Sequence, residues 1–96
     1  MDPALHKAAV QGSVASLKNL VAENPNILGS KAPQQNTALH IAAGLGHAGF
    51  AEAALGVDDK LLVNKNADGD TPLHLAARAG KVDVADLLIG RARAWP

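Results

Sequence analysis

The chain has 96 residues, nine acidic and nine basic side chains, and a formal net charge of zero at pH 7. This length allows one small domain, and a neutral chain with 2% aromatic residues lacks the basic surface and stacking side chains used to bind nucleic acid. Cysteine is absent, which excludes disulfides and fits a reducing compartment. Because no run approaches the roughly 18 apolar residues of a membrane span, we expect a cytoplasmic segment without direct membrane insertion.

One segment of the chain occurs three times at a fixed spacing. The pattern Leu-His, then Ala-Ala and a closing Gly, occurs in residues 5–12, 39–46 and 73–80, so that each step is 34 residues. A period of this size is typical of repeat arrays, in which each unit is too small to bury its own core and must stack on its neighbours. The repeat therefore favours an extended binding surface over an enzyme active site.

Each copy predicts a short helix, a break at Gly, a second helix and a spacer. In the third copy Thr71 suits the N-cap and Pro72 the first helical position. His74 follows three residues after Thr71, where its ring can return a hydrogen bond to the cap as Glu does in a capping box. Gly80 ends this helix, and a second helix is expected over roughly 82–89.

The copies differ in ways that predict local differences in structure. In the first, Asp2 and the proline after it move the cap one residue earlier. In the second, Gln35 stands where the third has Gly69, which predicts a different turn geometry or a small strain. The spacers carry apolar pairs at 27–28 and 61–62, which are expected to hold the loops onto the stack. After Gly90 no polar closing unit follows, and we expect an end that is frayed or unshielded, with the apolar side of the last helix pair partly exposed and Trp95 mobile.

The repeated block resembles a known family. Thr71-Pro72-Leu73-His74-Leu75-Ala76-Ala77 followed by Gly80 is similar to the ankyrin signature, and the preceding 66–70 resembles the ankyrin turn. The opening residues 1–9 and the spacer at 24–28 further resemble plant ankyrin-repeat membrane proteins of the accelerated-cell-death type. That resemblance implies further repeats and a membrane domain beyond this segment.

Each motif that could indicate a chemical site has a structural interpretation that fits the sequence better. His6, His40 and His74 recur at one position of successive units, and packed helices lie about 8–10 Å apart, too far for three rings to share one zinc ion. We interpret these three histidines as capping their helices from within. The segment 64–69 matches half of a calcium loop, but Leu75 stands where that loop needs Glu. We therefore predict no metal, no cofactor and no catalytic residues.

The candidate binding residues are the positions that vary between copies while the Leu, His and Ala-Ala positions do not. The ankyrin resemblance implies that partners bind the turn tips and the inward side of the first helices. Leu45 is the expected apolar anchor, beside polar groups that fix specificity. Carried over to this chain, this inner face comprises Val10, Gln11, Gln34, Asn36, Leu45, Asp68, Asp70 and Arg78.

The sequence predicts an all-α ankyrin-repeat solenoid of about three stacked helix-turn-helix units with short hairpin-like turns. It forms one domain, 1–96, with units at about 1–34, 35–68 and 69–96. The predicted function is protein–protein interaction, and the protein is expected to be a monomer or to self-associate weakly through its uncapped C-terminal end. The alternative is an intramolecular regulatory segment of a larger membrane protein, in plant defence signalling.

Overall fold

The computed structural model describes residues 1–94, and within them the fold is entirely helical. Single-turn 3-10 helices η1 (Ile27–Gly29) and η2 (Pro33–Gln35) and the slightly longer η3 (Asp59–Val63) lie in the spacers. The α-helices are α1 (Pro3–Gln11), α2 (Val14–Glu23), α3 (Ala38–Leu45), α4 (Ala48–Val57), α5 (Pro72–Arg78) and α6 (Val82–Arg93).

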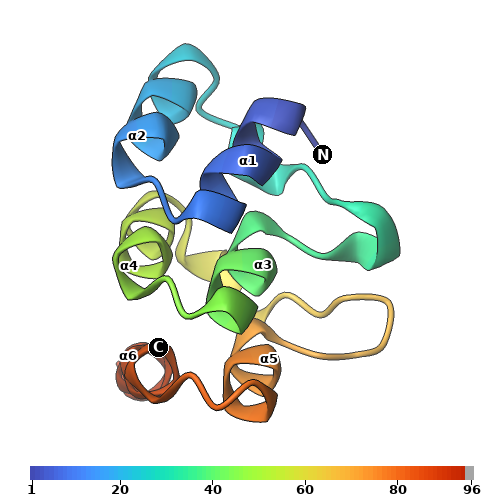
Figure 1. Ribbon diagram of the computed structural model, residues 1–96, viewed down its shortest axis with the longest axis vertical. Helices are drawn as coiled ribbons and strands as arrows, with labels where there is room; N and C mark the ends of the chain where they lie inside the picture. The colour runs from blue at the N-terminus through green and yellow to red at the C-terminus, as the bar shows by residue number, and fades with distance from the viewer. Residues whose placement is uncertain (95–96) are drawn as a thin grey trace.

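The helices stack in two columns (Figure 1). One column contains α1, α3 and α5, and the other contains α2, α4 and α6, so that each successive helix pair lies directly below the one before it. The segments that lead into α3 and α5 project sideways as loops, away from the second column. This arrangement is the stacked-unit architecture that the 34-residue period predicts.

The second and third units confirm the predicted histidine caps. The Thr37 amide donates to Nδ1 of His40 at 3.1 Å, and the Thr71 amide donates to Nδ1 of His74 at 2.9 Å. The prediction for His6 is wrong. Asp2 caps α1 instead, with its Oδ1 accepting from the amides of the second and third helical residues, because the cap has moved one residue back and left His6 exposed beyond reach.

The core lies between the two columns and continues from unit to unit. The Leu of each Leu-His pair is fully buried in the first two units, at Leu5 and Leu39. The spacer pairs at 27–28 and 61–62 are buried too, as their spacing predicts. Two fully buried apolar side chains of the second column were not predicted, Phe50 in α4 and Val84 in α6. They occupy the same position of successive units, so their 34-residue separation was the signal that could have identified them.

The C-terminal segment differs from its prediction. Helix α6 continues to Arg93 instead of ending near residue 89, so residues 90–93 are helical and not frayed. The alternative expectation, an unshielded end, is confirmed by the exposure of Val82 and Ile89 on α6. Arg91 and Arg93 lie in the last turn, where positive charge interacts favourably with the carbonyl end of a helix. The prediction of a mobile Trp95 lies outside the described residues. No helix within 1–94 has the length and apolar character required to cross a membrane.

Candidate functional site

The loops before α3 and α5 are tight hairpins with different backbone geometry. Before α5, the Asn66 amide donates to the Asp70 carbonyl at 2.9 Å, and Gly69 takes the left-handed conformation with φ of 81°. The loop before α3 closes in the same way, from the Ala32 amide to the Asn36 carbonyl at 2.8 Å. This confirms the polar hairpin turn that the sequence predicts.

The hairpin of the second unit is strained, as the substitution at Gln35 predicts. Gln35 takes φ of 62° where the third unit has Gly69, and Gln34 beside it takes φ of 66°. Side chains other than Gly rarely occupy this region because Cβ crowds the backbone. The sequence did not predict the positive φ of Gln34. Its conformation fits position i+2 of a type II turn, in which Pro33 occupies position i+1.

Hydrogen bonds join the two hairpins to each other. The side-chain amide of Asn66 donates to Oδ1 of Asn36 at 2.9 Å, and the Ala67 backbone amide donates to the Gln34 carbonyl at 2.8 Å. Asn66 also accepts from the amides of Asp68 and Asp70 through its Oδ1. These bonds hold the turn tips of the second and third units in register, which gives the candidate surface a fixed shape.

His40 connects the hairpin of the third unit to the helix of the second. Since its Nδ1 accepts the Thr37 amide, the ring proton lies on Nε2, which donates to the Asp70 carbonyl at 2.8 Å. The side chain is fully buried. Burial lowers the pKa of His40 below its usual value of 6.5, although the backbone carbonyl of Asp70 partly offsets this effect. His40 is therefore a neutral linker between units.

The ends of the first-column helices present the apolar part of the candidate surface. Val10 near the end of α1 is 42% exposed, and Leu45 at the end of α3 is 47% exposed. At the end of α5, a guanidinium nitrogen of Arg78 lies 3.0 Å from Oδ2 of Asp70. The Arg78 side chain is 67% exposed and that of Asp70 18% exposed, so the pair lies at the surface with the cation outermost.

Two apolar residues of this surface were not predicted from the sequence. Ile41 lies one turn before Leu45 on the same side of α3 and is half-buried. Leu75 of α5 lies beside α3, where a Cβ added to Gly44 would be 4.0 Å from its Cβ. Ile41 and Leu75 occupy the same position of the repeat, which holds Lys7 in the first unit. The change from a charged to an aliphatic residue at this position was the sequence signal that could have identified them.

The remaining predicted residues lie in two places, because Gln11 lines a hollow between α1 and α2 whereas Asn36 and Asp68 belong to the hairpins. Gln11 in α1 and Asp68 at the tip of the third-unit hairpin are exposed, while Asn36 is half-buried through its bond to Asn66. The structure thus brings Asp70 and Arg78 together and links Gln34 and Asn36 to the neighbouring hairpin. No group of three or more metal-ligating side chains lies within binding distance in residues 1–94.

Comparisons with known proteins agree with this geometry. A family model described as "Ankyrin repeats (3 copies)" matches residues 4–94, and the chain belongs to the ankyrin-repeat family. It is similar to the crystal structure of the human ASB11 ankyrin repeat domain, with a TM-score of 0.80 and 29% sequence identity. The match covers 95% of this chain and 40% of that one, so the chain spans less than half of the ASB11 domain. A search of curated proteins found no match. Ankyrin repeats are generally protein-interaction modules and typically are not enzymes.

Proposed function

We propose that this protein binds another protein through its inner face, with Leu45 as the apolar anchor and the Asp70–Arg78 pair beside it as the polar contact. The observation that supports this most directly is the exposure of Leu45 at the end of α3, one turn after the half-buried Ile41. A large aliphatic side chain exposed on a rigid element contributes binding energy when a partner covers it.

The fixed hairpins support the same proposal. The bonds between Asn66 and Asn36, and between Ala67 and Gln34, restrict the turn tips before a partner arrives. A surface that is already ordered loses less conformational entropy on binding. Arg78 adds specificity, because its exposed guanidinium retains free N–H donors beyond the one that bonds Asp70. A carboxylate on the partner is the group that fits these donors best.

Affinity purification from the source cells tests this proposal. The bait is used as the native chain, as the inner-face variant Leu45→Glu/Arg78→Glu, and as the outer-face variant Lys18→Glu/Asp86→Lys. All four positions are exposed, so all three baits should fold equally. We expect one protein to be captured by the native and outer-face baits and lost from the inner-face bait. Capture by the inner-face bait with loss from the outer-face bait would place the binding surface on the opposite side.

A second candidate function is regulation within a longer polypeptide, in which this segment binds another part of its own membrane-anchored chain. The resemblance to plant proteins of the accelerated-cell-death type motivates this alternative, with a role in defence signalling on the cytosolic side of a membrane. The exposure of Val82 and Ile89 on α6 within residues 1–94 favours it, because a neighbouring segment of the same chain could pack there. A reading frame that encodes transmembrane helices after Pro96 would support it.

A further inference from the structure

A groove with a mostly aliphatic lining lies on the second column, between α2 and α4. Its volume is about 340 Å³, at the small end of the range for ligand-binding sites. Leu17 of α2 is fully buried beneath it, and Val57 at the end of α4 is 48% exposed. We call this hollow the outer groove: Leu17, Lys18, Val21, Ala22, Ala53 and Val57.

Small side chains on α4 explain why the outer groove is open. The position of Ala53 holds Leu87 in the third unit, and the Leu87 side chain packs against the core. The position of Val57 holds the longer Arg91 in the third unit. The contact between α4 and α6 therefore has larger side chains at both positions. The outer groove depends on residues that are particular to the contact between α2 and α4.

Lys18 gives the outer groove a positive charge toward one end. Among the lining residues within 1–94, Lys18 alone has a polar side chain. The only ion pair within the described residues joins Arg78 to Asp70, so the Lys18 ammonium has no carboxylate partner there. Ala22 follows four residues later on α2, about 6 Å further along the helix axis. The groove thus runs from a cation to purely aliphatic groups.

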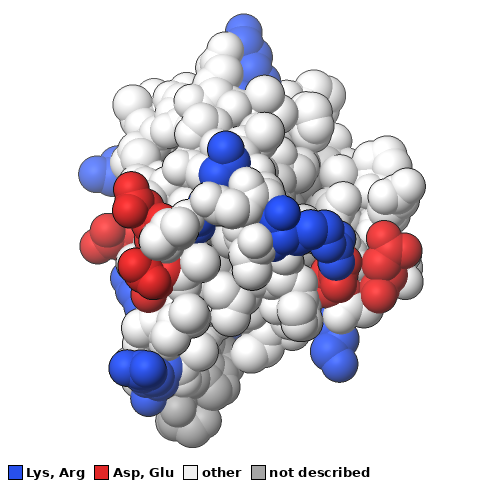
Figure 2. All heavy atoms as spheres, turned by 60° about the horizontal axis from the view of Figure 1, so that its bottom comes forward, with Lys and Arg blue, Asp and Glu red and all other residues white. Residues whose placement is uncertain are grey.

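The charges around the outer groove favour an anion at Lys18 over the opposite end. Ala22 and Val57 lie in the last turns of α2 and α4, where the carbonyl ends of the helices repel negative charge. Glu52 stands at the position of Lys18 one helix below, in α4. Figure 2 shows acidic side chains gathered at the left, on the side where Figure 1 draws the second column. An anionic group in the groove is therefore directed to Lys18 on α2.

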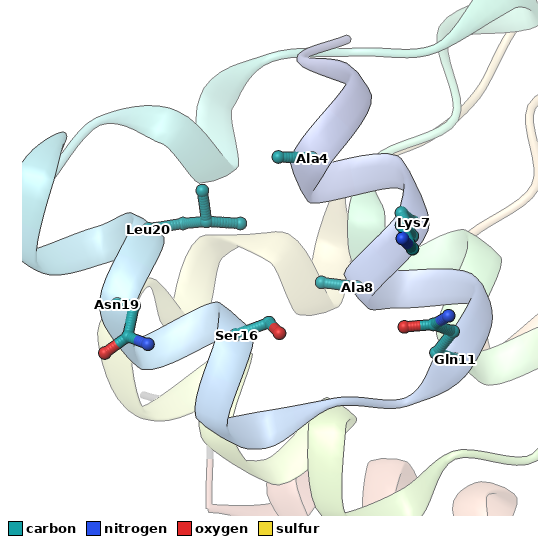
Figure 3. A pocket seen from close by; sticks show the side chains of 7 residues that line it. All are labelled: Ala4, Lys7, Ala8, Gln11, Ser16, Asn19 and Leu20. Carbon is teal, nitrogen blue, oxygen red and sulfur yellow. The ribbon is translucent and has the colours of Figure 1, made fainter.

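A second hollow of similar size has a different lining. Figure 3 shows this hollow of about 330 Å³ between α1 and α2, with Lys7, Gln11, Ser16 and Asn19 among its lining residues. An aliphatic chain in that hollow would remove water from these polar groups without giving them new partners. Of these two hollows, the outer groove is therefore the one that fits an aliphatic ligand.

We propose that the outer groove binds a free medium-chain fatty acid, with the carboxylate at Lys18 and the hydrocarbon chain along Ala53 toward Val57. A fatty acid has polar atoms at one end only, which matches a groove whose described lining has one polar side chain. An extended peptide would place backbone amides against aliphatic side chains that offer them no hydrogen bonds. This site is separate from the inner face, because it lies between helices of the second column.

The test is an NMR titration of the purified chain with decanoate below its micellar concentration. We expect one saturable site, and an affinity that rises up to about fourfold per methylene from hexanoate to decanoate, the equivalent of about 0.8 kcal/mol. Decyltrimethylammonium has the same chain and the opposite charge, and it should bind about fivefold more weakly because it meets Lys18. Equal affinity for the two amphiphiles, or no saturable binding of decanoate, would overturn the proposal.

Ala53→Leu fills the outer groove with the side chain that the third unit has at the same position. It should weaken decanoate binding at least about tenfold. Ala15→Leu is the matched control, because it adds the same side chain at an exposed position of α2 outside the groove and should leave the affinity unchanged. Decanoate binding that survives Ala53→Leu, or that Ala15→Leu weakens equally, would overturn the proposal.

Lys18→Glu tests the position of the carboxylate. This exposed substitution should reverse the preference, so that decyltrimethylammonium binds more tightly than decanoate. Loss of folding would weaken both amphiphiles and could not produce such a reversal. A preference for decanoate that is unchanged in Lys18→Glu would overturn the proposal.

Discussion

Replacing His40 should destabilise the protein far more than replacing His74, although both residues form the same capping arrangement. His40→Ala leaves the buried Thr37 amide without its acceptor, which costs about 1–3 kcal/mol. It also leaves a cavity where a fully buried ring stood, which adds about 2 kcal/mol. The Asp70 carbonyl keeps the Asn66 amide as a donor, so no further unpaired group arises there. The expected total is about 3–5 kcal/mol.

His74→Ala is the matched control, because its ring is exposed and water can replace each bond that is lost. Its expected cost is about 1 kcal/mol or less. Urea unfolding of both variants at neutral pH, followed by far-UV circular dichroism, measures the difference. A domain of this size has a stability of about 5–15 kcal/mol, so the His40 variant should retain a measurable transition. Equal losses for the two variants would refute the assigned role of His40 as a buried link between units.

Three further predictions concern stability. Leu39→Ala should cost about 2–5 kcal/mol, because Leu39 is fully buried between units; a melting temperature within a degree or two of the native value would contradict the stacked core. Gln35→Gly should stabilise the protein by up to about 1 kcal/mol by relieving a positive φ, whereas Gln11→Gly within α1 should destabilise it by a similar amount in the same urea assay. Lowering the pH below about 6.5 should destabilise the protein, because His40 binds a proton more readily in the unfolded chain than in its buried native position. The effect should be absent above that pH and smaller in His40→Ala.

Much of the fold was predictable from local sequence because the repeat presents the same signals three times. The Thr-Pro start of α5 and the closing Gly residues set helix ends that the structure confirms to within one or two residues. The extension of α6 to Arg93 was missed, because the expected helix stopped at about residue 89, although Gly56, at the position of Gly90 in the second unit, also lies inside its helix α4. The unit boundaries near residues 34 and 68 remain a prediction.

The residues of the candidate site could be predicted from the positions that vary between the repeats. The hydrogen bonds and the ion pair between these residues could not be predicted. The spacing places Asp70 before α5 and Arg78 at its end, but the ion pair between them depends on how the hairpin folds back. The bond from Asn66 to Asn36 depends on the stacking distance between units, which no local pattern encodes. Ile41 was missed because the repeat pattern separates core positions from surface positions, and a half-buried residue such as Ile41 fits neither group.

The most direct test of the inner face is the affinity of the purified complex with each side of the molecule altered in turn. We expect Leu45→Glu and Arg78→Glu each to weaken binding about 30-fold in isothermal titration calorimetry, the equivalent of about 2 kcal/mol. Lys18→Glu and Asp86→Lys, exposed on the second-column helices α2 and α6, should change the dissociation constant by less than about threefold, or about 0.7 kcal/mol. If the second-column substitutions weaken the complex and the inner-face substitutions do not, the inner face is not the binding surface.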